Sequence, residues 1–319
     1  MVSGRQGPAP RRARLLTEDP AAKAFLLSTV YCLLEIMRVL ITGAGGMVGG
    51  ALVEHCRGLG DEVLAFDREG LDVTDERAAR EAFGRLRPEA VVNCAAWTDV
   101  DGCELDPQRA FLVNSQGVEA LASASRMASA SFVTISTDYV FDGRKPEGFY
   151  TQRDDPHPAS AYGAAKLEGE RRAQVASART SVVRTGWVFG PGGRNFLATA
   201  VERARRGERL KAISDAWGTP TYAPDLAARL RELAELDLPG VYHVVNAGEG
   251  TSFEGFARAA AEAAGLPGVE VEPVLMDSLK RPAPRPRNSR LRCLISEAIG
   301  LRPLRDWRDA LAEFAGMNR

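Results

Sequence analysis

Two short segments of the sequence carry side chains that suit proton transfer. Tyr162 and Lys166 lie four residues apart in a stretch of helical character, and residues at this spacing share one face of a helix. An ammonium group next to a phenol favours the phenolate and lowers the tyrosine pKa, so we expect Tyr162 to exchange a proton near neutral pH. Thr137 ends an expected strand, where its hydroxyl group could hold a substrate oxygen beside Tyr162.

Each segment has an ordinary structural interpretation when it is considered alone. A Tyr-x-x-x-Lys pair often lies on a solvated helix face, and a Ser-Thr pair at a strand end is more often a turn or a helix cap. The two segments indicate a catalytic site only in combination with each other and with a glycine-rich turn that precedes them in the chain.

That glycine-rich turn predicts a dinucleotide-binding site. A short apolar run leads into Gly43-x-x-Gly46-x-x-Gly49 and then into a helical segment. A side chain at any of these glycines would keep the backbone away from a pyrophosphate, and the helix that follows presents unpaired N–H groups and the positive end of its dipole to that anion. A glycine trio is weak evidence alone, but Asp67, an acid about 20 residues further on, closes a second apolar run and strengthens the prediction.

Strand-like and helix-like segments alternate after this turn and must position the candidate groups. We expect strands over residues 89–93, 131–136 and 180–184, and helices over residues 77–86, 107–128 and 161–176. This alternation predicts an α/β fold, a Rossmann-type doubly wound parallel sheet whose ligands bind at the carboxyl ends of the strands. Residues 37–190 are expected to form an NAD(P)-binding domain, to which later segments return, and residues 191–319 mainly a smaller C-terminal substrate-binding lobe.

Composition excludes several classes of protein. The chain has 319 residues, enough for one large domain or two unequal ones, and its formal net charge of -1 gives no reason to expect nucleic acid or a membrane as a partner. Five cysteines without a Cys-x-x-Cys pair and three scattered histidines predict no metal cluster. The odd number of cysteines fits a reduced chain in the cytoplasm better than a secreted disulfide scaffold.

Residues 1–36 differ from the rest of the chain. A segment rich in Pro, Gly and Arg is followed by a mostly apolar stretch, and Met37 would serve as a start codon directly before the first strand. We interpret residues 1–36 as an extension, either a disordered tail or the result of a wrongly assigned start. A signal peptide or an anchor is the less favoured alternative, because no clear cleavage site follows and the apolar stretch is short for a membrane span.

The motifs together resemble those of the extended short-chain dehydrogenase/reductases. More narrowly, the chain is similar to the dTDP-4-dehydrorhamnose reductase family from Met37 almost to the C-terminus. The segments that carry this narrower resemblance are residues 92–101, 136–143, 184–188, 218–221, 225–227 and 285–291. The last of them, Arg-Pro-Arg-Asn-Ser-Arg-Leu, is far more specific than the glycine turn.

The resemblance implies a reaction and a set of roles. The 4-keto group of a dTDP-6-deoxy sugar accepts hydride from NADPH or NADH, and the product is dTDP-L-rhamnose. Tyr162 would donate the proton, Lys166 would bind the nicotinamide ribose and tune Tyr162, and Thr137 would polarise the carbonyl. The remaining cofactor contacts implied are Gly43, Gly46, Met47, Val48, Gly49, Asp67, Arg68, Asp72, Val73, Ala95, Ala96, Trp97 and Thr98. The substrate contacts implied are Val100, Thr137, Asp138, Tyr139, Trp187, Arg287 and Arg290.

Three details stay open at this stage. Asp67 suits the ribose 2'-hydroxyl group of NAD, whereas Arg68 could pair with the 2'-phosphate of NADP. One of Arg285, Arg287 and Arg290 could pair bidentately with the substrate pyrophosphate, against the alternative of a solvated basic loop. Some family members form a Mg²⁺-linked dimer through an acid two residues after the last turn glycine. This chain has Gly50-Ala51 there, so Mg²⁺ is doubtful, while a homodimer remains an open outcome.

Three alternative functions share these motifs. The chain could reduce another dTDP-4-keto-6-deoxy sugar, or it could be a nucleotide-sugar epimerase or dehydratase, which residues 285–291 disfavour. A non-catalytic regulator is the alternative from another class, because the regulatory β subunit of methionine adenosyltransferase resembles the same family. Thr137, Tyr162 and Lys166 are all present, which favours an enzyme.

Overall fold

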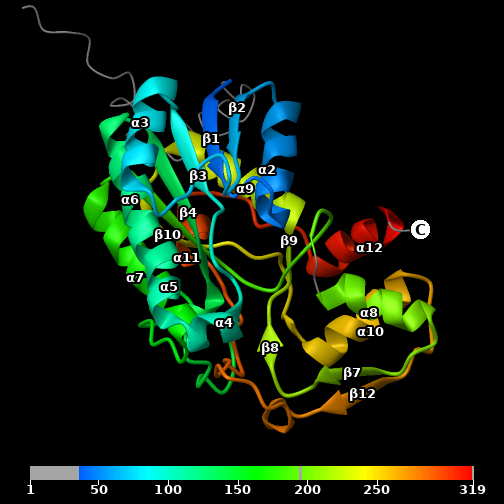
Figure 1. Cartoon of the computed structure of the whole chain (residues 1–319). Helices are drawn as coiled ribbons and strands as arrows, with labels where there is room; N and C mark the ends of the chain where they lie inside the picture. Colours follow the sequence, from blue (N-terminus) through cyan, green and yellow to red (C-terminus); the bar gives the residue numbers. More distant parts are fainter. Residues whose placement is uncertain (1–35, 194–195, 318–319) are drawn as a thin grey trace, which may run out of the picture. The chain divides into compact units, whose positions relative to one another are not determined.

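A six-stranded sheet organises the chain in the computed structural model, which describes residues 36–193 and 196–317. The predictions for residues 1–35 lie outside the described residues. The strand order is β10-β5-β4-β3-β1-β2, and every pair is parallel (Figure 1). The six strands are β1 (Arg38–Thr42), β2 (Glu62–Phe66), β3 (Ala90–Asn93), β4 (Ser131–Thr137), β5 (Thr180–Thr185) and β10 (Gly240–His243).

Helices cover both faces of this sheet, because its central strands are apolar on both sides. Val39 and Ile41 of β1 pack with α2 (Met47–Gly58) and α9 (Ala223–Leu236), whereas Leu40 faces the opposite cluster. That opposite cluster includes residues of α3 (Glu76–Leu86), α6 (Gly117–Met127) and α7 (Ala161–Ala176). The predicted α/β fold, a Rossmann-type doubly wound parallel sheet, is confirmed. Strand order reverses between β1 and β3, where folds of this kind bind their ligands.

The expected helix over residues 107–128 is interrupted. The structure has α5 (Pro107–Phe111), a π-helical turn η2 (Leu112–Gln116) and then α6. The Asn114 side chain reaches back to the backbone of Trp97, and a Cβ atom on Gly169 of α7 would lie 2.1 Å from the Asn114 carbonyl oxygen. The wider turn accommodates these two tertiary contacts, which no local pattern in residues 107–128 reveals.

Further small elements lie outside the large sheet, most of them in the later part of the chain. They are η3 (Asp138–Val140), α4 (Val100–Leu105), β6 (Val188–Phe189), α8 (Phe196–Arg205), β7 (Leu210–Ile213), β8 (Trp217–Gly218), β9 (Thr221–Tyr222), β11 (Thr251–Ser252), α10 (Phe253–Ala263), β12 (Val271–Val274), η4 (Met276–Ser278), α11 (Leu294–Ala298) and α12 (Trp307–Met317). The short strands pair as β6 with β9, β7 with β12 and β8 with β11. The functional division near residue 190 remains a prediction.

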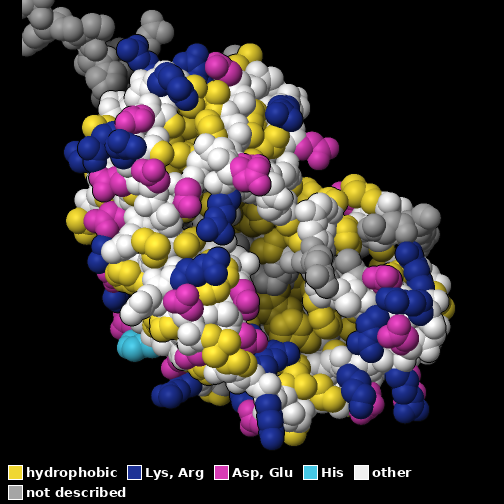
Figure 2. All heavy atoms as spheres, in the orientation of Figure 1, with side chains coloured by type: hydrophobic (Ala, Val, Ile, Leu, Met, Phe, Trp, Pro, Cys, Tyr) yellow, Lys and Arg dark blue, Asp and Glu magenta, His cyan; other side chains and the backbone are white. Residues whose placement is uncertain are grey.

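A hollow with hydrophobic walls opens beside the helices α4 and α5, opposite α8 and α10 (Figures 1 and 2). Separate clusters of buried apolar side chains stabilise the two sides. Tyr162 packs with Cys103 and Ala110 on one side, and Phe189 packs with Phe256 and Trp307 on the other. Within the described part of the chain, none of the helices has the length and apolar character that a membrane crossing requires.

A buried ion pair joins α9 to the edge of the sheet. The Arg231 guanidinium donates to both carboxylate oxygens of Asp61 at 2.6 and 2.9 Å, and the two side chains are 1% and 0% exposed. Replacing Arg231 with Met leaves the Asp61 carboxylate buried without this partner, so we expect a loss of about 3–5 kcal/mol in the free energy of unfolding. Urea unfolding of the variant and the wild type measures this loss in the free energy of unfolding. Arg203→Met, which breaks an exposed pair with Glu208, is the control and should cost less than about 1 kcal/mol.

Candidate active site

The helix α7 carries two of the three predicted catalytic residues. Ser160 caps this helix, because its hydroxyl group accepts the Gly163 N–H at 3.2 Å. Tyr162 and Lys166 lie one turn apart on the same face, and both are buried. The Lys166 ammonium donates to the carbonyl oxygen of Ile135 in β4 at 2.6 Å.

Thr137 meets Tyr162 because the end of β4 lies against the first turn of α7. A Cβ atom on Gly163 would lie 2.2 Å from the carbonyl oxygen of Tyr139, so only glycine permits this approach. The Thr137 hydroxyl group acts on the Tyr162 phenol from this position, and it donates to Asp138 Oδ1 at 3.1 Å. The structure therefore brings Thr137, Tyr162 and Lys166 to one place.

The electrostatics of this group differ from our expectation for Tyr162. Burial raises the pKa of Tyr162, and this effect outweighs that of the neighbouring Thr137 hydroxyl group, which lowers it. The expected lowering by Lys166 is therefore wrong, because a buried phenolate loses its hydration. Burial likewise lowers the pKa of Lys166 to about 8, although Glu170 opposes that shift. Tyr162 is thus a neutral phenol near pH 7, the form that donates a proton.

The glycine turn has the shape that a dinucleotide requires. Gly43 has φ +68°, and a Cβ atom there would lie 2.6 Å from the Ala95 nitrogen. A Cβ atom on Gly49 would lie 2.1 Å from the Gly43 carbonyl oxygen. Gly46 precedes α2 without a side-chain cap, and no acid stands in the first turn, which Met47 and Val48 begin. Close backbone packing and an uncapped, uncharged helix start fit a pyrophosphate.

The residues predicted for the adenosine side border this turn. Asp67 and Arg68 are exposed directly after β2, and the Asp67 carboxylate accepts the Gly70 N–H at 2.9 Å. A Cβ atom on Gly45 would lie 3.8 Å from the Asp67 Cβ atom, so Asp67 stands beside the turn. Asp72 accepts two hydrogen bonds from Thr74, which lower its pKa, while the Val73 side chain is buried.

The segment after β3 closes the other side of the glycine turn. Ala95 touches the turn at Gly43, and Ala96, Trp97 and Thr98 follow it with partly or fully exposed side chains. Asn114 Oδ1 accepts the Trp97 N–H, and Asn114 Nδ2 donates to the Trp97 carbonyl oxygen, each at 2.9 Å. Sequence reasoning missed Asn114, since a single asparagine inside a helical pattern carries no signal of its partner.

Aromatic and apolar side chains lead from Tyr162 to the predicted substrate contacts. Trp97, Val100 and Tyr139 pack in the same cluster as Tyr162, and the two tyrosine rings meet edge to face with centroids 6.1 Å apart. Trp187 instead packs against the cluster of Phe189 and Phe256, and it is stacked on Phe253 with ring centroids 3.8 Å apart. One face of the Trp187 ring is therefore already covered by protein.

Asp138 stands out among the buried polar groups. Its Oδ2 atom has no hydrogen-bond partner among the described residues, and burial raises the pKa of its carboxyl group to about 6. A Cβ atom on Gly186 would lie 2.4 Å from the Asp138 Cγ atom, so glycine at 186 makes room for the carboxyl group. Asp138 is therefore a buried carboxyl group directly beside Thr137, and its contact with the substrate remains a prediction.

The three arginines of the C-terminal loop have different partners. Arg285 pairs with both carboxylate oxygens of Asp101, and Arg287 pairs with Asp215 and Asp277. Arg290 pairs with no carboxylate among the described residues. Its guanidinium lies 5.5 Å from the ring centroid of Phe149 and 5.6 Å from that of Trp217.

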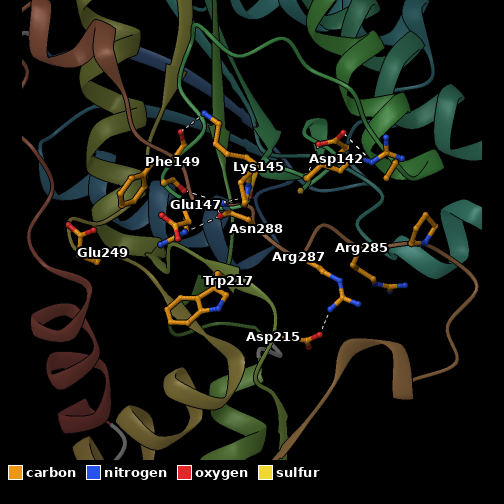
Figure 3. A pocket seen from close by; sticks show the side chains of 17 residues that line it. Asp142, Lys145, Glu147, Phe149, Asp215, Trp217, Glu249, Arg285, Arg287 and Asn288 are labelled. Carbon is orange, nitrogen blue, oxygen red and sulfur yellow. Dashed lines mark hydrogen bonds and ion pairs between the residues drawn. The ribbon is translucent and has the colours of Figure 1, made fainter.

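Arg287 and Arg290 line a cavity of about 1000 Å³. The loop at residues 142–149 forms one wall, and Trp217 faces it from β8 (Figure 3). Arg285, Pro284 and Asn288 complete the side formed by the C-terminal loop. The cavity thus combines aromatic rings and guanidinium groups with the carboxylates of Asp142, Glu147, Asp215 and Glu249.

Known proteins are similar to this chain over most of its length. Residues 37–318 match the RmlD substrate binding domain model. A dTDP-4-dehydrorhamnose reductase from Mycolicibacterium smegmatis is 40% identical over 88% of this chain and 86% of its own length. A dTDP-4-keto-6-deoxy-D-glucose reductase from Streptomyces niveus is 37% identical over 86% of this chain and 96% of its own length. 

One solved structure extends the comparison to the fold. It is a dTDP-4-dehydrorhamnose reductase from Bacillus anthracis in complex with NADP. It is 32% identical to this chain, with a TM-score of 0.85, and the match covers 89% of this chain and 100% of that one. The chain therefore belongs to the RmlD substrate binding domain family, and its resemblance to the dTDP-4-dehydrorhamnose reductases is confirmed.

Proposed function

We propose that the chain reduces the 4-keto group of dTDP-4-dehydro-L-rhamnose to give dTDP-L-rhamnose, with NADPH or NADH as the reductant. The observation that carries the proposal is the buried Tyr162 phenol, whose pKa burial raises, one turn before Lys166 on α7 and beside Thr137 at the end of β4. The names of the relatives support the substrate, and the NADP complex of the Bacillus anthracis protein supports the cofactor. A cytoplasmic location and a homodimeric state are also part of the proposal.

Each catalytic side chain has one task in this reaction. The bound cofactor supplies a hydride to the carbonyl carbon. Tyr162 gives its phenolic proton to the carbonyl oxygen, so the keto group becomes a hydroxyl group and Tyr162 is left as the phenolate. Thr137 holds that oxygen in line with Tyr162, and the Lys166 ammonium, one turn along α7, stabilises the phenolate.

A related sugar is the second candidate substrate. The Streptomyces niveus relative is named for dTDP-4-keto-6-deoxy-D-glucose, which undergoes the same reduction at a different arrangement of hydroxyl groups. Asp138, the predicted substrate contact beside Thr137, is the residue that we expect to distinguish the two sugars. Comparing kcat/KM for the two sugars shows which of them is the better substrate.

The deciding experiment follows the loss of NADPH absorbance with enzymatically prepared dTDP-4-keto-L-rhamnose, and repeats it with NADH. Oxidation with dTDP-L-rhamnose as the product supports the proposal and ranks the two cofactors. Conversion of the sugar without net oxidation would favour an epimerase or dehydratase instead. Cofactor binding without turnover of either sugar, together with co-purification of a methionine adenosyltransferase, would favour the regulatory alternative.

Arg290 is the arginine that we expect to hold the substrate pyrophosphate. Since no carboxylate competes for its guanidinium, Arg290→Ala should raise KM for the dTDP sugar about tenfold and leave kcat nearly unchanged. Arg287→Ala is the matched comparison, and it should change KM less because Asp215 and Asp277 already bind Arg287. Equal KM values for the wild type and Arg290→Ala would remove Arg290 from the substrate site.

A further inference from the structure

A buried carboxylate lies directly behind the catalytic group. Glu170 stands one turn after Lys166 on α7, and the two residues are 3% and 4% exposed. The Glu170 carboxylate accepts a short hydrogen bond from the Ser136 hydroxyl group. Neither the proposed reaction nor the sequence motifs assign a task to this carboxylate.

Ser136 lies between the two residues of β4 that contact the catalytic side chains. The carbonyl oxygen of the preceding residue, Ile135, accepts a hydrogen bond from the Lys166 ammonium, and the following residue, Thr137, lies beside Tyr162. Any shift of Ser136 along or across the strand therefore moves both contacts together. The bond from Ser136 to Glu170 holds this end of β4 against α7.

An arginine of the neighbouring strand fixes the carboxylate in turn. Arg184 of β5 is the register partner of Ser136, and its Nε atom donates to Glu170 Oε1 at 3.0 Å while Nη2 donates to Oε2 at 2.7 Å. Arg184 is 5% exposed, and its guanidinium lies over the Phe141 ring. Glu170 thus ties α7, β4 and β5 together beneath the site.

Glu170 also acts on Lys166 through its charge from one turn away on α7, although its direct ion pair is with Arg184. The other titratable groups that act on Lys166 are Cys94, after β3, and Cys103, in α4. Burial raises the pKa of these thiols to about 12 and about 11, so both are neutral near pH 7. His243, near Arg184, is neutral as well, because burial lowers its pKa to about 3.

We propose that Glu170 is a positioning residue for the reduction. Through Ser136 it fixes the end of β4 that presents Ile135 and Thr137, and through its charge it keeps Lys166 in the ammonium form. The effect that we predict on kcat rests on the proposed function. The effect that we predict of Glu170 on the charge of Lys166 can be measured without any turnover. Arg184 holds Glu170 in place and contacts none of the reacting groups in the described structure.

The test substitutes Glu170→Gln in the full chain and measures the titration of Lys166 directly. The sequence has five lysines, Lys23, Lys145, Lys166, Lys211 and Lys280, so ¹³C NMR of labelled lysine resolves each one, with Lys166→Arg as the assignment variant. Loss of the carboxylate charge should lower the Lys166 pKa by roughly one unit from about 8. Glu168→Gln on the same helix is the matched control, because Glu168 pairs with Arg172 at the surface, and it should leave the titration unchanged.

The kinetic readout has a definite direction. The ammonium form of Lys166 is the active one, so kcat falls as pH rises through the Lys166 pKa. In Glu170→Gln this fall should begin roughly one pH unit lower, which makes kcat at pH 8 about fivefold smaller than in the wild type. Ser136→Ala keeps the charge of Glu170 but loses the hydrogen bond that holds the end of β4, so its kcat should drop roughly three- to tenfold while the fall with pH stays at the wild-type position.

The possible outcomes distinguish a failure of the role of Glu170 from a failure of the proposed function. An unshifted Lys166 titration in folded Glu170→Gln would overturn the role of Glu170, whatever the enzyme reduces. A shifted titration in a chain whose wild type reduces neither sugar would overturn the proposed function alone. If Glu170→Gln does not fold, Ser136→Ala decides, and wild-type kcat in that variant would overturn the inference.

Discussion

Tyr162→Phe is expected to lower kcat by about 100-fold or more while the affinity for NADPH stays nearly unchanged. The phenol is the proton donor in the proposed reduction, and removing a general acid costs about this much. Phenylalanine fills the same buried space beside Tyr139, so the cofactor side of the site is preserved. Single-turnover reduction measures the chemical step, and NADPH fluorescence measures binding.

A second tyrosine provides the control for this variant. The Tyr242 hydroxyl group of β10 donates to the Leu238 carbonyl oxygen at 2.8 Å, away from the catalytic group. Tyr242→Phe should lose about 1 kcal/mol of stability at wild-type kcat. Turnover of Tyr162→Phe within a few-fold of the wild type would exclude Tyr162 as the proton donor.

Gly49→Ala is expected to weaken NADPH binding by about 100-fold, which corresponds to roughly 2.7 kcal/mol. The new Cβ atom would lie 2.1 Å from the Gly43 carbonyl oxygen and 2.9 Å from the Ala44 Cα atom, so the glycine turn itself must move. The displaced backbone no longer presents its N–H groups to the pyrophosphate. Fluorescence titration with NADPH measures the change.

The adjacent residue supplies a matched control for the glycine variant. A Cβ atom on Gly50 would lie 3.7 Å from the Ala44 carbonyl oxygen, an ordinary contact, so Gly50→Ala should bind NADPH as the wild type does. Thermal unfolding of both variants distinguishes a displaced turn from a destabilised chain. Undiminished NADPH affinity in Gly49→Ala would contradict the assignment of the turn to the cofactor.

Patterns of neighbouring residues determined the architecture and the location of the candidate site. Apolar runs such as Val39–Ile41 are buried on both faces only in a covered parallel sheet, and the glycine turn follows directly from one of them. The helix over residues 161–176 agrees with α7 at both ends, because alanine-rich composition and the Ser160 cap are local signals. Local signals suffice when the physical cause lies within a few residues.

Only the tertiary structure decided how the side chains in the site are charged and paired. The pKa of Tyr162 rises because distant segments bury it, an effect that the spacing to Lys166 does not contain. Arg285 pairs with Asp101 across 184 positions of sequence, which distinguishes it from Arg290 in the same short loop. Glu170 finds its partners in β4 and β5 for the same reason. Burial and ion pairing depend on which segments come into contact in the folded chain. A single sequence contains composition and spacing but not these tertiary contacts.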